Sequence, residues 1–148
     1  MRPPWAWCII NLPGKSWKDV ENRSRNSLHR GPLLIHASGT LTREDYSNAR
    51  AYARDVGLPY DAFPTFEALA ALRGQLLGAV RMVDVSAPGY EPDDRPSSPW
   101  RDPDSFGYHL TDRIALPHRP LKGRLGLFEV EPTRAEVEAL RPLWPLSP

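Results

Sequence analysis

The segment KDVENRSRNSLHRGPLLIHAS, residues 18–38, places a dense group of charged side chains directly before an apolar run. The run GPLLIHAS, residues 31–38, is bounded by Gly31-Pro32 and Gly39, which is typical of a strand that is covered on both faces. In an extended chain alternate side chains share a face, so Glu21 and Arg23 are expected to point the same way. The stretch therefore predicts a core strand with a charged segment beside it.

Positive charge is concentrated in the first third of the chain. Residues 1–43 contain seven Lys and Arg against two acidic residues, whereas the remainder contains twelve against sixteen. Such asymmetry favours a surface that faces a polyanion. The alternative is ordinary solvated charge. The seven basic residues are Arg2, Lys15, Lys18, Arg23, Arg25, Arg30 and Arg43.

Hydrophobic patterns and turn residues outline an α+β protein. Thr42 with Asp45, and Thr133 with Glu136, have the spacing of capping boxes at helix starts, and Gly78 suits a bulge. The order of elements does not alternate strictly as in a parallel sheet, so we expect a mixed or antiparallel sheet that is curled into a small β-barrel with flanking helices. The patterns predict helices from Pro4 to near Pro13 and over 42–57, 65–73 and 133–144, with strands over 31–38, 76–88, 106–117 and 123–132.

The 148 residues fit a single domain, 1–148, with a proline-rich tail over 142–148. The segment 88–105 is rich in proline and acidic residues, so we expect a long loop that gates a cleft or stays mobile and does not bind phosphate. One cysteine, Cys8, indicates a reducing compartment, by default the cytoplasm. No run approaches the length of a membrane span. The four histidines are too widely separated to predict a metal site.

Basic and aromatic side chains alternate around the charged segment. Cations suit phosphates, and flat rings suit base stacking, which together are what single-stranded nucleic acid requires. Glu21 is able to accept from a base edge. The alternative is a network of ion pairs that only solubilises a strand end. The candidate contact residues are Lys15, Lys18, Glu21, Arg23, Arg25, Arg30, Trp5, Ser38 and Tyr108.

The chain resembles the ASCH domain of the PUA-like superfamily. The resemblance rests on Pro4-Trp5, on the K-x-x-E-x-R pattern formed by Lys18, Glu21 and Arg23, on RGPLLIHAS, and on the later GAVRMVDV, FGYHLTDRIALP and PLKGRLGLFEV. It implies a small β-barrel with helices at its sides and a cleft beside the K-x-x-E-x-R segment, in a superfamily associated with RNA or modified bases. Lys15, which directly follows Gly14, is an alternative to Lys18 as the functional lysine.

Three functions are compatible with these residues. The first is binding of RNA, of another single-stranded nucleic acid or of a modified nucleoside, without a cofactor. The second, which the enzyme members of the resembled family imply, is a hydrolase in which Lys18 and Glu21 are acid-base partners, most simply a ribonuclease on single-stranded RNA that uses a divalent metal. An amidohydrolase on a modified nucleoside is less favoured, because Glu21 stands where that branch of the family has a threonine nucleophile. The third is a small-molecule or protein-interaction module.

Overall fold

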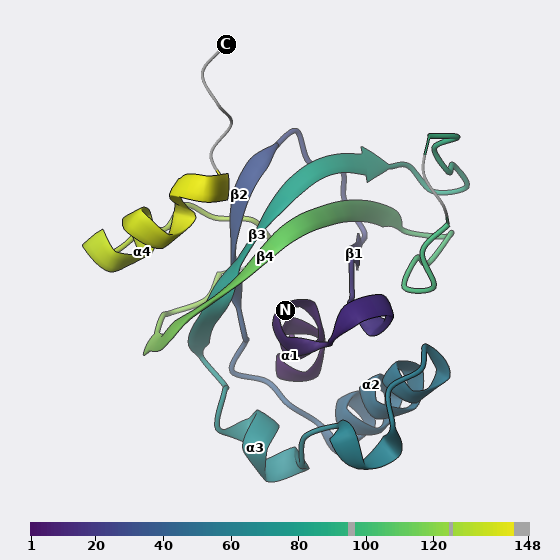
Figure 1. The fold of residues 1–148 in the computed structure, drawn as a ribbon, viewed down its shortest axis with the longest axis horizontal. Helices are drawn as coiled ribbons and strands as arrows, with labels where there is room; N and C mark the ends of the chain where they lie inside the picture. Colours follow the sequence, from purple (N-terminus) through teal and green to yellow (C-terminus); the bar gives the residue numbers. More distant parts are fainter. Residues whose placement is uncertain (95–96, 125, 144–148) are drawn as a thin grey trace.

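Four antiparallel strands form one curved sheet in the computed structural model, which describes residues 1–94, 97–124 and 126–143. The long strands β3 and β4 form the centre, and the short strands β1 and β2 form the two edges (Figure 1). The sheet is curled but does not close into the expected barrel, since the edge strands do not pair with each other. The strands are β1 (Val20–Arg23), β2 (Gly31–His36), β3 (Gln75–Ser86) and β4 (Phe106–Pro120), in the order β1-β4-β3-β2.

Helix α1 (Pro3–Asn11) lies inside the curve of the sheet (Figure 1). It begins with two prolines, which suit the first turn of a helix because their missing N–H groups need no partner there. Gly78 makes its close approach possible: a Cβ there would lie 2.7 Å from Ile10 Cδ1 and 2.4 Å from the carbonyl oxygen of Ile114. The register of β3 shifts between Leu76 and Gly78, which confirms the predicted bulge.

The predicted pair of helices between β2 and β3 is present. α2 (Arg43–Asp55) begins with the predicted capping box of Thr42 and Asp45. α3 (Phe66–Ala70) is shorter than predicted, because residues 71–74 form turns instead of continuing the helix. The N–H of Gly74 donates to the carbonyl of Ala37 at 2.8 Å. One short 3-10 turn, Tyr60–Ala62, lies between α2 and α3, and another, Gly14–Ser16, lies between α1 and β1.

The strand predicted over 123–132 is wrong: the described residues of this range contain no strand. Gly126 has a φ of +74°, which breaks an extended chain. β4 instead continues to Pro120, and the chain then crosses to α4 (Arg134–Leu140), whose capping box of Thr133 and Glu136 is confirmed. A final turn, Arg141–Leu143, follows, and residues 144–148, most of the predicted tail, lie outside the described residues.

Across the described ranges, no helix has both the length and the apolar character that crossing a bilayer requires.

Candidate functional site

The side chains of strand β1 point alternately to two different environments. Val20 is buried in the core, and Asn22 faces the loop after β3, where its side-chain amide donates to the carbonyl of Trp100 at 2.8 Å. Glu21 and Arg23 lie on the other face and line a cavity. The predicted shared face of Glu21 and Arg23 is therefore confirmed, since it follows from the alternation of an extended chain.

Lys18 is buried rather than exposed to a ligand. Its side chain is 4% exposed, and its ammonium group donates to the carbonyl of Val20 at 2.5 Å and lies 3.2 Å from Glu21 Oε2. The rings of Trp5 and Trp100 lie 5.9 and 5.5 Å from the ammonium, which adds cation–π attraction. Lys18 does not line the cavity, so it holds Glu21 in place and compensates the charge of Glu21 from behind.

The loop after β3 supports this arrangement. Trp100 is buried, stacks on Tyr52 with ring centroids 4.8 Å apart, and donates from its indole N–H to the carbonyl of Ser16 at 3.2 Å. Arg101 is buried as well. Its guanidinium lies 2.9 Å from a carboxylate oxygen of Glu91 and donates to carbonyl groups at both ends of the loop.

None of the described loop residues, 88–94 and 97–105, lines the cavity. The prediction that this loop gates the cleft is therefore wrong for these residues. Trp100 anchors the loop against Lys18, which itself does not line the cavity. The loop packs behind the Lys18–Glu21 pair instead.

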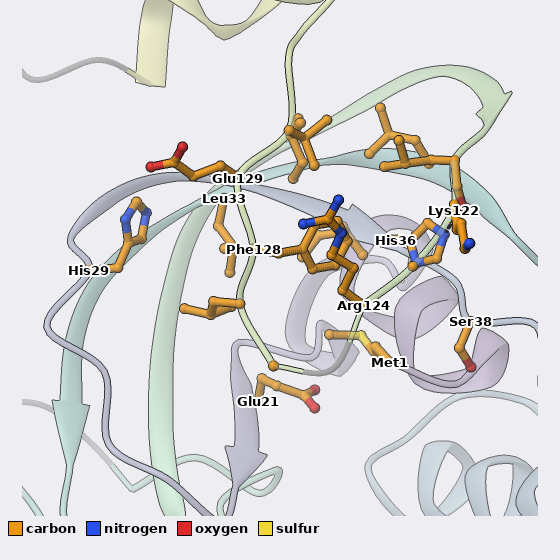
Figure 2. A pocket seen from close by; sticks show the side chains of 18 of the residues that line it. Met1, Glu21, His29, Leu33, His36, Ser38, Lys122, Arg124, Phe128 and Glu129 are labelled. Atoms are coloured by element: carbon orange, nitrogen blue, oxygen red, sulfur yellow. Dashed lines mark hydrogen bonds between the residues drawn. The ribbon is translucent and has the colours of Figure 1, made fainter.

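The cavity has a volume of about 1280 Å³ and lies between the two edges of the sheet, which do not pair with each other. Both edge strands line it, and the opposite wall is residues 121–124 and 126–130, which we call the covering segment (Figure 2). Leu33 and Ile35 of β2 and Phe128 of the covering segment make much of the surface apolar. An apolar cavity with a few polar groups is the usual form of a small-molecule site, and this volume is ample for a nucleotide.

The covering segment is held by His36 at the end of β2. The Nε2 atom of His36 lies 2.6 Å from the carbonyl oxygen of Leu121, and its ring meets the ring of Phe128 edge-on at 6.3 Å. Gly123 passes directly over His36, since a Cβ there would lie 2.7 Å from His36 Cε1. Figure 2 shows His36, Phe128 and Arg124 gathered on one side of the cavity.

The cavity carries an excess of positive charge. Arg23, Lys122 and Arg124 line it, and none of them forms an ion pair with any of the residues that the structure describes. The lining acids are Glu21, which Lys18 already pairs, and Glu129. An anionic ligand therefore meets uncompensated cations here.

Tyr108 of β4 completes the wall beside Arg23. Its hydroxyl donates to the carbonyl of Arg25 at 2.7 Å. Burial raises the pKa of the Tyr108 phenol, so the hydroxyl stays protonated and remains a donor at neutral pH.

The structure divides the predicted contact residues into groups. Trp5, Glu21, Arg23, Ser38 and Tyr108 line the cavity together. Lys18 lies behind Glu21, and Arg25 lines a smaller adjoining hollow. Lys15 and Arg30 line neither space, and Arg30 lies 3.7 Å from Asp84.

Sequence reasoning missed the covering segment. Arg124 and Phe128 lie in the incorrectly predicted strand over 123–132, and Lys122 directly precedes it. The signal for them was the pair of glycines, Gly123 and Gly126, because glycine inside a strand pattern often marks a close approach of the backbone. No group of three potential metal ligands occurs within the described parts of the chain.

Comparison with known proteins found no family model that matches the chain and no matching curated protein.

Proposed function

We propose that this protein binds single-stranded RNA or a modified nucleotide in the cavity between β1, β2 and the covering segment. The observation that carries the proposal is the different status of the two charged side chains on β1. Lys18 neutralises Glu21 from behind, whereas Arg23 has no carboxylate partner among the described residues. A ligand with both a base and a phosphate gives Glu21 a hydrogen-bond donor and gives Arg23 an anionic partner.

Each part of a nucleotide has a matching surface in the cavity. The half-buried side chains of Trp5 and Phe128 offer stacking faces or edges for a base, and the buried Tyr108 adds only the small part of its surface that reaches the cavity. Ionised Glu21 only accepts hydrogen bonds, so it favours an exocyclic amino group on the base. Arg23 is free for a phosphate.

The resemblance to ASCH domains supports the same proposal. Glu21 and Arg23 of the K-x-x-E-x-R pattern line the cavity, and Lys18 contacts Glu21 directly. We propose that the open, curled sheet is a PUA-like fold in which the covering segment takes the place of a closing strand. The single cysteine is compatible with work in a reducing compartment such as the cytoplasm.

A hydrolase that cleaves RNA is the second candidate, and the presence of the Glu21 carboxylate in the cavity favours it. Glu21 would accept the proton of the hydroxyl or water that attacks phosphorus, and the bond from phosphorus to the leaving oxygen would break. Arg23 would stabilise the negative charge that develops on the non-bridging phosphate oxygens. Lys18 would orient Glu21 and would not contact the phosphate.

A binding titration tests the proposed function. Fluorescence anisotropy of a labelled single-stranded RNA is followed across a salt series for wild type, Arg23→Ala and the control Arg54→Ala, which removes an exposed arginine on α2. We expect salt-dependent binding that Arg23→Ala weakens by about tenfold and Arg54→Ala leaves unchanged. Equal loss in both variants, or no binding by wild type, would refute the proposal.

The same samples are then run on a gel to detect cleavage. Cleavage that Glu21→Gln abolishes while RNA still binds would establish the hydrolase, because glutamine keeps the shape of Glu21 but not its basicity. Intact RNA in every sample would establish binding alone.

A further inference from the structure

We infer that the ligand is an oligonucleotide with at least two linked nucleotides, and that Arg25 binds the phosphate next to the nucleotide in the cavity. This inference rests on the proposed function. A hollow of about 450 Å³ adjoins the cavity, and both spaces are lined by Arg23, Tyr108, Gly126 and Leu127. The two hollows therefore meet along one shared wall.

The chemistry of the smaller hollow suits a phosphate. Its remaining lining residues are Ser24, Arg25, Asn26 and Ser27, so it presents cationic and neutral donors and no carboxylate among the described residues. Arg25 is exposed and forms no ion pair within the described ranges. A free nucleoside would leave these donors unused, whereas a phosphodiester leaving the cavity meets them at once.

The turn that carries Arg25 is held in place before any ligand binds. Tyr108 donates from its hydroxyl to the Arg25 carbonyl at 2.7 Å, and Asn26 Oδ1 accepts from the N–H of Ser27 at 2.8 Å. Arg30 donates to the carbonyl of Ser27 at 3.0 Å. Arg30 thus positions the turn.

Tyr108 links the two spaces physically. Its ring lines the cavity, its hydroxyl fixes the turn, and Arg23 lies in both linings. A strand with one base in the cavity therefore passes its sugar along Tyr108 and Arg23 and places the next phosphate beside Arg25. The ligand is single-stranded, because a base enclosed in the cavity has to be unpaired.

The test compares nucleoside monophosphates with dinucleotides and a short single-stranded RNA as competitors for a labelled RNA. The variants are Arg25→Ala, the charge-preserving Arg25→Lys and the control Arg54→Ala. We expect wild type to bind dinucleotides about tenfold more tightly than monophosphates. Arg25→Ala should remove this advantage and reduce the salt slope for RNA by about 0.7, without changing the affinity for monophosphates. Arg25→Lys should restore most of the slope.

The result that overturns the inference is monophosphate binding equal to dinucleotide binding, or an Arg25→Ala variant that binds RNA like wild type. Either would leave the proposed function intact. Absence of binding for every nucleotide would overturn the proposed function and the inference together. Because Arg25 is exposed, unchanged thermal unfolding is expected to show that its variants are folded.

Discussion

The ammonium group of Lys18 lies 3.2 Å from Glu21 Oε2, and the two side chains are only 4% and 13% exposed. A buried charge is tolerated when its partner is in place, and removal of one partner leaves the other without compensation. Lys18 and Glu21 of the charged segment therefore form a buried pair, whereas Arg23 lines the cavity and is available to a ligand.

Replacement of Lys18 by methionine should destabilise the protein by about 3 kcal/mol, because Glu21 then keeps a buried charge without a partner. Urea unfolding measures the change. The control Lys15→Met removes an exposed lysine and should change stability by less than about 0.5 kcal/mol. The double variant Lys18→Met with Glu21→Leu should regain much of the loss. Equal stability of the two single variants would show that the pair does not stabilise the fold.

Gly78→Ala should destabilise the protein by about 1–3 kcal/mol, since the added methyl group would lie 2.4 Å from a backbone oxygen and 2.7 Å from Ile10. Gly39→Ala is the matched control, because no atom lies within 4 Å of the Cβ that would be added. Thermal unfolding of both variants measures the difference. A Gly78→Ala variant as stable as Gly39→Ala would contradict the close packing of α1 on β3.

Several local features were predictable because neighbouring residues determine them. The capping boxes at Thr42 and Thr133 require only residues three positions apart, and the bulge at Gly78 follows from a glycine within a valine-rich strand. The shared face of Glu21 and Arg23 is equally local, because alternate side chains of an extended chain point the same way.

The covering segment and the burial of Lys18 were not predictable in this way. The range 123–132 has the composition of a strand, but whether it pairs depends on the position of the sheet edges. Lys18 is buried by Trp100, which lies far away along the chain and reaches it through a loop. Periodicity contains no information about such long-range contacts.

Cys8 should be unreactive in the folded protein. Burial raises the pKa of its thiol to about 12, and only the thiolate attacks alkylating reagents. Iodoacetamide at pH 8 should modify the urea-unfolded chain quickly and the native chain hardly at all, as read by intact-mass spectrometry. Rapid modification of the native protein would mean that α1 opens readily from the sheet.

The Arg119–Glu136 pair should make stability depend on acidic pH. Hydrogen bonds from Arg119, at 2.8 and 2.9 Å, lower the pKa of the Glu136 carboxyl below its ordinary value of 4.5. The unfolded chain therefore takes up the proton first as pH falls. The stabilisation is complete above about pH 4.5 and is lost as the pH falls through the lower folded-state value.

Urea unfolding at neutral and acidic pH measures this dependence. Glu136→Gln should lower stability at neutral pH and flatten the pH dependence, because glutamine does not titrate. The control Glu138→Gln removes an exposed carboxylate that pairs with Arg141 on the surface, and it should retain the wild-type profile. Identical profiles for the two variants would contradict the assignment.

The most direct test of the central claim is to map where single-stranded RNA touches the protein. RNA containing a photoreactive base is crosslinked to the native protein, and the modified peptides are identified by mass spectrometry. Binding in the cavity predicts adducts on Trp5, Tyr108 or Phe128, and their loss in Arg23→Ala. Adducts confined to the exposed rings of Tyr60 and Tyr90, or adducts that persist equally in Arg23→Ala, would contradict it.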